Sequence, residues 1–143
     1  MQKILIIDDE ESMCEMLTIM LSRQGYEPRS TASGTRALEM LMDDSFDLVI
    51  TDLKMPDMDG IELLGRIRQK LPDIPVIVMT AYTSLTTAVG ALRNGAFDYI
   101  AKPFQKDLMS ASVARALENS RLKKDNRKLR QTLEREIGKD PLD

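Results

Sequence analysis

Short apolar runs alternate with helix-like patterns along the chain. The apolar runs are rich in β-branched residues and show no polar alternation, which is typical of parallel strands covered on both faces. They span Lys3–Ile7, Leu48–Thr51, Val76–Thr80 and Tyr99–Ala101. A fifth candidate strand, Tyr26–Thr31, contains Pro28. Because proline cannot donate a hydrogen bond to a neighbouring strand, this segment is predicted to lie at an edge of the sheet.

The segments between these runs carry apolar residues at spacings of three and four, the pattern of amphipathic helices. The clearest stripe comprises Met13, Met16, Leu17, Met20 and Leu21, and a later one comprises Leu85, Ala88, Val89 and Leu92. Ser84 is a candidate helix cap, and Asn94-Gly95 is a candidate helix end. Five strands alternating with five helices predict an α/β fold, a doubly wound parallel sheet with helices on both faces.

Polar side chains directly follow several of the predicted strands. They are Asp8, Asp9, Asp52, Thr80 and Lys102. Each alone has an ordinary interpretation as a helix cap, a turn residue, a satisfied hydroxyl or a solvated charge. In open parallel sheets, however, ligand sites lie beyond the carboxyl ends of the strands, so these residues are expected to gather at one edge. Three crowded carboxylates repel one another unless a cation or protons neutralise them. This predicts a Mg²⁺ site, to which the backbone carbonyl of Lys54 is a further candidate ligand.

These residue types predict phosphoryl transfer. An aspartate beside a metal can attack phosphorus and form an acyl phosphate, which makes Asp52, at a strand end opposite the other charges, the candidate phosphoacceptor. A metal and a lysine neutralise the phosphoryl oxygens while a hydroxyl donates to one of them, and these roles suit Lys102 and Thr80. Ala81 is small and leaves room for the phosphoryl group. Such a chain modifies itself and is not expected to be a turnover enzyme.

Composition argues against several other chemistries. The chain has no His and a single Cys, Cys14, which excludes an intramolecular disulfide and fits a reducing cytoplasm. Zinc, haem and histidine-based acid–base catalysis are therefore not expected. Hydrophobic residues make up 43% and charged residues 30%, an ordinary globular composition. No apolar stretch reaches the length of a membrane span, so no membrane association is expected.

Five motifs resemble those of the bacterial response regulator receiver domain, over residues 3 to about 120. They are Asp8-Asp9-Glu10, the stretch Asp52–Gly60, Thr80-Ala81, Tyr99 and Lys102-Pro103-Phe104. The resemblance implies a flavodoxin-like sheet with the strand order 2-1-3-4-5. It also implies that a sensor histidine kinase is the partner that transfers a phosphoryl group to Asp52.

The resemblance further implies roles for individual residues. Mg²⁺ would bind at Asp9 and Asp52, with Asp8 assisting. Thr80 and Tyr99 would report the phosphorylated state to the rest of the domain. All the motif residues keep to the pattern of the family, so a receiver that is unable to accept phosphate is not expected.

Three more features follow from the same resemblance. The Lys102-Pro103 peptide is expected to be cis. Lys54 and Tyr82 occupy variable positions that tune the lifetime of the phosphoryl group in this family. Their effect on the rate does not follow from the residue types alone.

The C-terminal residues differ in character from the rest of the chain. Residues 1–120 carry 12 Lys or Arg against 18 Asp or Glu, whereas residues 121–143 carry 8 against 5. From Val113 to Ile137 there is no Gly or Pro, and most residues are strong helix formers. One helix is therefore predicted to run from about Lys106 into the extension. We expect a receiver at residues 1–120 and a helical extension at residues 121–143.

A leucine seam in this extension predicts a two-stranded coiled coil and hence a homodimer. Leu122, Asn126, Leu129 and Leu133 fit alternating d and a positions, and the asparagine at an a position would specify the register. Toward the receiver the same register meets polar residues, so the seam is either short or shifts its phase near Leu117. A solvated helical linker is the alternative interpretation. Direct nucleic-acid binding by the basic face is not favoured, because glutamates are interspersed near the leucines.

The tail suggests a longer protein. Residues 136–141 resemble the start of the ATPase module in activators of sigma-54 RNA polymerase, and the stretches 52–56 and 80–82 resemble receivers of that subclass. The chain is therefore expected to control downstream ATPase and DNA-binding domains.

Two other functions share part of this pattern. A haloacid-dehalogenase-like phosphatase also uses a strand-end aspartate with Mg²⁺, but that family needs a second aspartate where Lys54 stands. A flavodoxin-like mononucleotide binder needs hydroxyls and glycines in its first loop, whereas residues 8–11 are all acidic and would repel a phosphate. Turnover of a phosphomonoester would indicate the first, and flavin absorbance the second.

Overall fold

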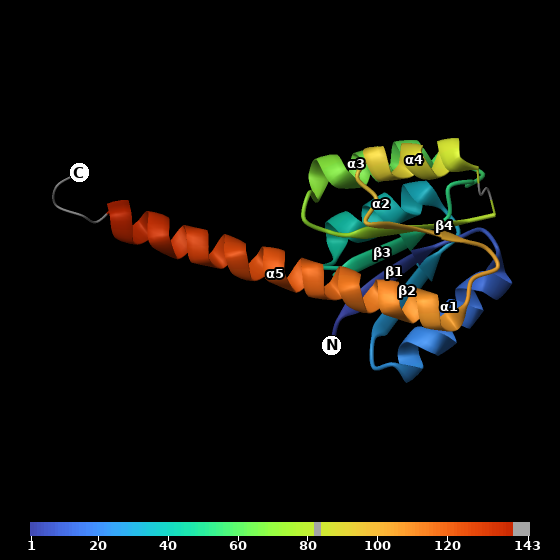
Figure 1. Ribbon diagram of the computed structural model, residues 1–143, viewed down its shortest axis with the longest axis horizontal. Coiled ribbons are helices and arrows are strands. Elements are labelled where there is room, and N and C mark those ends of the chain that lie inside the picture. The colour runs from blue at the N-terminus through green and yellow to red at the C-terminus, as the bar shows by residue number, and fades with distance from the viewer. Residues whose placement is uncertain (82–83, 139–143) are drawn as a thin grey trace.

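The computed structural model describes residues 1–81 and 84–138, and strands and helices alternate through it (Figure 1). The strands are β1 (Lys3–Ile7), β2 (Glu27–Thr31), β3 (Leu48–Thr51), β4 (Val76–Thr80) and β5 (Asp98–Ala101). The helices are α1 (Glu11–Arg23), α2 (Gly34–Asp43), α3 (Gly60–Lys70), α4 (Leu85–Arg93) and α5 (Lys106–Gly138). The predicted alternation is confirmed.

The five strands form one parallel sheet in the order β2-β1-β3-β4-β5, so the doubly wound, flavodoxin-like fold is also confirmed. β2 is an edge strand, and its Pro28 lies opposite Ile4 of β1. An edge strand has only one neighbour, so a residue that cannot donate a ladder hydrogen bond is tolerated there.

Alternate residues of each strand pack on opposite faces of the sheet, and helices cover both faces. Leu5 and Ile7 join the core under α2, α3 and α4, whereas Ile4 and Ile6 join the core under α1 and α5. Figure 1 shows these two sets of helices on opposite faces of the sheet. All four side chains are fully buried. Strands that are covered on both sides need apolar residues at every position, which explains the uninterrupted runs in the sequence.

Two of the predicted helix stripes are less buried than their spacing suggests. In α1, Leu17, Met20 and Leu21 are buried, but Met16 is 40% exposed. In α4, Leu85 and Leu92 are 80% and 48% exposed, and Ala91 is the buried residue. Helix α4 packs on α3 and on β5, the last strand, so one side of it stays open to solvent.

Helix α5 extends far beyond the sheet (Figure 1). Up to Ser120 it contributes buried residues to the core, whereas residues 121–135 are all exposed. We call residues 121–138 the arm. Although α5 is long, it is polar: within the part of the chain that the structure describes, no helix is long and apolar enough to cross a membrane.

Two ion pairs hold the first turns of the arm near the base of the sheet. Lys124 Nζ lies 2.6 Å from Asp47 Oδ1, and Arg127 pairs with Asp73. Spacings of three and four place both cations on the same face of α5 as the buried Ser120. By the same geometry, the predicted seam lies on the opposite face. Its leucines, Leu122, Leu129 and Leu133, are 53%, 64% and 57% exposed.

Candidate functional site

The carboxyl ends of β1, β3 and β5 bring a lysine between two buried aspartates. Asp8 and Asp52 are 1% and 6% exposed, and Lys102 Nζ lies 2.7 Å from an oxygen of each. The contact with Asp52 Oδ2 is a well-directed hydrogen bond. The contact with Asp8 Oδ2 is an ion pair without hydrogen-bond geometry, so this buried oxygen can still accept from a further donor or bind a cation.

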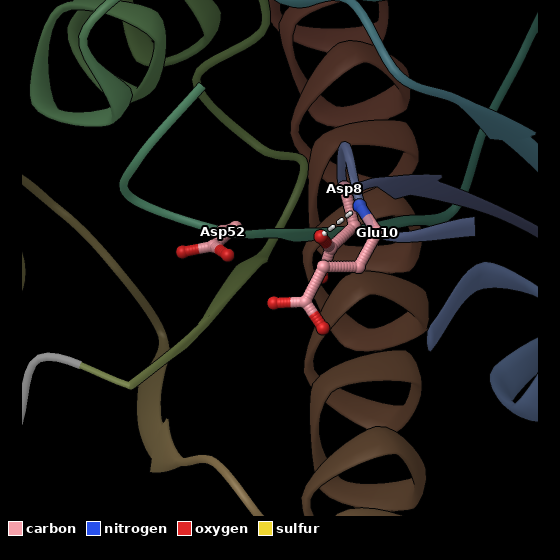
Figure 2. A group of neighbouring side chains, drawn as sticks. All are labelled: Asp8, Glu10 and Asp52. Atoms are coloured by element: carbon pink, nitrogen blue, oxygen red, sulfur yellow. Dashed lines mark hydrogen bonds between the residues drawn. The ribbon is translucent and has the colours of Figure 1, made fainter. Parts of the chain in front are cut away.

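A third carboxylate, that of Glu10, approaches Asp8 and Asp52 (Figure 2). One oxygen from each of the three side chains lies within 4.8 Å of the other two. Glu10 Oε1 is also 3.4 Å from Lys102 Nζ. The backbone of Glu10 is held in place because its N–H donates to Asp8 Oδ1 at 2.9 Å. We call the space around these four side chains the acidic cleft.

Negative charge in the acidic cleft is under-compensated, since one ammonium serves three carboxylates. Burial raises the pKa of Asp8 above its usual range, although the contact with Lys102 opposes the shift. Burial alone would lower the pKa of Lys102, but its contacts with Asp52 and Asp8 outweigh burial and raise that pKa. Lys102 therefore stays charged, and the cleft attracts a further cation.

Mg²⁺ fits this donor set, because it prefers hard carboxylate oxygens and retains several of its waters. The predicted ligands Asp8 and Asp52 supply such oxygens from inside the cleft. The predicted ligand Asp9 lines the same cleft, together with Lys54. Within the described residues, however, the trio of closest carboxylates contains Glu10 in place of Asp9.

The two predicted switch residues lie on β4 and β5. Thr80 ends β4 and is fully buried, and Ala81 follows it in the wall of the cleft. The ring of Tyr99 packs against the core under α2, α3 and α4, and burial raises the pKa of its hydroxyl. Within residues 1–81 and 84–138, Tyr99 Oη has no hydrogen-bond partner. The predicted cis peptide at Lys102-Pro103 is confirmed, whereas Tyr82 lies outside the described residues.

The loop between β3 and α3, which forms one wall of the cleft, is anchored at two points. Gly60 N donates to Leu53 O at 2.8 Å, and a Cβ on Gly60 would lie 2.4 Å from the Leu53 backbone, so only glycine fits there. Asp57 accepts from Ser33 Oγ at 2.7 Å and from two N–H groups at the start of α2 at 3.1 Å. These bonds, first that from Ser33, hold the pKa of Asp57 well below its usual range.

Together, the fold and the cleft define a flavodoxin-like α/β domain with a cation-attracting acidic cleft at the carboxyl edge of its sheet. The family within this class is clear from comparison with known proteins. Residues 4–114 match the family described as "Response regulator receiver domain", and the chain belongs to that family.

Several relatives are known. The chain is 44% identical over 131 residues to Regulatory protein AtoC of Escherichia coli (strain K12), which is 92% of this chain and 28% of AtoC. NtrX from Brucella abortus, solved in complex with ADP, superimposes with a TM-score of 0.83 at 35% identity, covering 91% of this chain and 29% of that one. The beryllofluoride-activated NtrC4 receiver domain dimer superimposes with a TM-score of 0.81 at 32% identity, covering 84% of this chain and 99% of that one. The chain thus spans less than a third of the length of AtoC.

These comparisons leave the haloacid-dehalogenase alternative without support. All of them point to receivers and regulatory proteins, and Lys54 stands where a phosphatase of that type needs its second aspartate.

Two residues near the site were not predicted to take part in it. Glu10 belongs to the first acidic motif, but no role of its own was predicted for it. Asp57 belongs to the loop motif, and its bonds to α2 join segments 22 to 24 residues apart in sequence. The available signal for both was an acidic residue next to a motif position, which is too common on protein surfaces to assign a role.

Proposed function

We propose that this chain is a phosphorylation-activated receiver, in which Asp52 accepts a phosphoryl group from a sensor histidine kinase with the help of Mg²⁺. The observation that carries this proposal is the position of Lys102 Nζ, 2.7 Å from both Asp52 and Asp8 at the carboxyl edge of the sheet. An ammonium held there can neutralise phosphoryl oxygens as the transfer proceeds. The proposed place of action is the cytoplasm, where such a kinase would present its phosphohistidine.

In the proposed reaction, a carboxylate oxygen of Asp52 forms a bond to phosphorus while the bond from phosphorus to the histidine nitrogen breaks. The imidazole leaves and takes a proton from water. Both oxygens of Asp52 are oriented in advance, because Oδ1 accepts from Lys54 N at 3.2 Å and Oδ2 accepts from Lys102 Nζ. Mg²⁺, held by Asp52 and Asp9 with Asp8 assisting, would supply positive charge to the phosphoryl oxygens. Since the protein itself is modified, it is not a turnover enzyme.

The proposed readout runs through β5 to α5. Thr80 and Tyr99 are the proposed switch residues, and Asp98 directly precedes the tyrosine. Asp98 Oδ2 accepts from Ser112 Oγ at 2.6 Å and pairs with Arg115 at 3.0 Å, so β5 is bonded to α5 beside the switch. A rearrangement of Tyr99 could therefore shift α5 as one rigid element.

The proposed output is a homodimer built on the seam of Leu122, Asn126, Leu129 and Leu133. Exposure of all three leucines supports it, as does a shallow groove that continues the seam onto the receiver beside Phe97 and Asn119. Asn119 Oδ1 is buried there without a hydrogen-bond partner in the described residues, and a second chain could satisfy it. The structure of NtrC4 that resembles this chain is that of a receiver dimer.

The receiver is further proposed to be part of a longer sigma-54-dependent transcription activator. Support comes from the small share of AtoC and NtrX that it covers, 28% and 29%. The receiver would comprise residues 1–120, because the burial of α5 ends at Ser120, and residues 121–143 would lead to ATPase and DNA-binding domains. We propose that the fragment itself contacts neither membrane nor nucleic acid. The last residues of the tail motif, 139–141, lie outside the described part of the chain.

The phosphoacceptor is tested by intact mass after incubation with acetyl phosphate and Mg²⁺. The wild-type protein should gain one phosphoryl group, and Asp52→Asn should gain none. Asp57→Asn changes another aspartate of the same loop and should be labelled like the wild type. Equal labelling of Asp52→Asn and the wild type would contradict the assignment.

The dimer is tested by sedimentation velocity at several protein concentrations, with and without beryllofluoride and Mg²⁺. The wild type should dimerise in at least one of these states. The double variant Leu129→Asp, Leu133→Asp should be monomeric in both and still accept one phosphoryl group. A wild-type chain that is monomeric in every condition would rule out this output.

A further inference from the structure

Glu10 stands at the N-cap of α1 but does not cap the helix. Its backbone is in the expected place, because its carbonyl accepts from Met13 N at 3.1 Å and from Cys14 N at 3.2 Å. Ser, Thr, Asp and Asn side chains in this position usually accept from the first N–H groups of the helix, whereas glutamate is not among the preferred capping residues. The Glu10 side chain makes no such bond. It lies instead at the acidic cleft, near Asp8 and Asp52 (Figure 2). There its Oε1 is 3.4 Å from Lys102 Nζ.

This position gives Lys102 three acidic neighbours. An ammonium has three N–H donors, and in the cleft its contacts are two short ones, to Asp8 and Asp52, and a longer one to Glu10. When a phosphoryl group forms on Asp52, its oxygens need the same ammonium. Glu10 therefore competes with the phosphoryl group for Lys102, and its charge also repels any anionic phosphoryl donor that enters the cleft.

We infer that Glu10 is a positioning residue that slows phosphorylation. Before transfer its carboxylate attracts the ammonium of Lys102, and its charge adds to the negative charge where the donor must approach. This inference rests on the proposed function and names a residue that regulates the same site. Its side chain is 57% exposed, so it can swing away once a donor is bound. The same exposure means that the pair contributes little to folding, and substitutions at Glu10 should leave the domain folded.

The chain offers a matched control for this idea. Glu11 is the next residue, lies in the first turn of α1 and is exposed, but it does not belong to the carboxylate trio of the cleft. Glu11→Gln therefore removes the same charge from the same end of the helix. Two variants of Glu10 separate its two effects. Glu10→Gln removes the charge but keeps an oxygen that can accept from Lys102, whereas Glu10→Ala removes both.

The experiment measures the initial rate of phosphorylation by acetyl phosphate at saturating Mg²⁺, over a range of ionic strength. At low salt, Glu10→Gln should raise the rate about three- to tenfold, and Glu10→Ala at least as much, as expected for one charge near an anionic donor in a solvated cleft. Glu11→Gln should raise it less than twofold. The gain should shrink as salt shortens the range of the charge. A rate that is unchanged or lower in Glu10→Gln, or an equal gain in Glu11→Gln, overturns the inference.

Calorimetric titration with Mg²⁺ alone gives a second readout. If Glu10 acts on Lys102 and on the donor, Glu10→Gln should change the affinity for Mg²⁺ by less than threefold. A loss of tenfold or more would make Glu10 a metal ligand and overturn the inference. Failure of the wild-type protein to be phosphorylated at all would instead contradict the proposed function, so the two failures are distinguishable.

Discussion

The acidic cleft and the arm both rest on contacts between cations and aspartates, but in opposite surroundings. In the cleft the Lys102 side chain is 7% exposed, and the side chains of its partners Asp8 and Asp52, taken without their backbone, are 0% and 9% exposed. On the arm the Lys124 side chain is 51% exposed. The distances are nearly equal, 2.7 Å in the cleft and 2.6 Å on the arm. The distance between the charges therefore does not tell which pair contributes more free energy, whereas the burial of the side chains does.

The physical reason is the cost of removing a charge from water. An exposed pair is screened and contributes about 0–1 kcal/mol, whereas removing one partner of a buried pair leaves an uncompensated charge and costs about 3–5 kcal/mol. The cleft also contains more carboxylates than cations, so its net negative charge attracts a cationic ligand. On the arm, each of the two pairs joins one cation to one carboxylate in exposed surroundings, so these pairs can do little more than orient a helix.

The largest expected difference lies in phosphorylation. Lys102→Met removes the ammonium between the two aspartates and should slow labelling by acetyl phosphate about 100- to 1,000-fold, because positioned charge at the transition state is lost. Lys124→Met removes an equivalent side chain from the arm and should leave the rate within about twofold. Intact mass against time gives both rates. Similar losses in the two variants would remove the distinction between the cleft and the arm.

The loop between β3 and α3, which forms one wall of the cleft, should not tolerate a side chain at Gly60. Gly60→Ala places a methyl group 2.4 Å from the Leu53 backbone, and we expect it to destabilise the domain by about 1–3 kcal/mol. Gly65→Ala, in the exposed middle of α3 with no atom within 4 Å of the new Cβ, should stabilise it by about 0.5–1 kcal/mol. Urea unfolding of both variants measures the contrast. A neutral Gly60→Ala would show that the loop can move away.

A smaller effect should depend on pH. The pKa of Asp57 is depressed in the folded state, so its bonds to α2 stabilise the fold fully above the unfolded-state pKa of about 4, and this contribution is lost as pH falls below that value. Thermal unfolding should separate wild type from Asp57→Asn most at pH 7, and the gap should narrow between pH 4 and pH 3. Asp125→Asn, on the arm, is the control. A gap that persists unchanged at pH 3 would argue against the anchor.

The smallest effect is expected at the base of the arm. Replacing Asp47 and Asp73 together by Asn removes the ion pairs of Lys124 and Arg127 with the domain, and the loss of stability should stay under about 1 kcal/mol. Hydrogen exchange should rise in residues 121–127 and remain unchanged in the buried part of α5. The effect should fade in high salt. Faster exchange throughout α5 would show that the pairs support the whole helix.

Much of this protein could be predicted from residues close together in the chain. The apolar runs identified four of the five strands, and Pro28 correctly placed the fifth, β2, at an edge. Parallel strands end at the same edge of a sheet, so Asp8, Asp52 and Lys102 had to meet once their strands were recognised. The family motifs added the cis peptide at Lys102 and Pro103. The roles of the site residues and the seam remain predictions.

Other features arise from contacts between distant parts of the chain. On the arm, Lys124 pairs with Asp47, which lies 77 residues earlier in the chain. No pattern among neighbouring residues predicts that contact. How far α4 is buried depends on where it packs over the sheet. Leu85 is therefore 80% exposed, although it belongs to a regular apolar stripe.

Glu10 shows most clearly the difference between what the sequence predicts and what the tertiary structure decides. The order of charges along the chain allows either Asp9 or Glu10 to turn toward Lys102, because both directly follow the same strand. In the folded protein, the backbone at the start of α1 and the ammonium arriving from β5 bring Glu10 into the trio, whereas Asp9 lines the cleft outside it. Local periodicity specifies which residues reach the edge of the sheet. Side-chain direction there is set by the packing and electric field of segments that meet only when the chain folds.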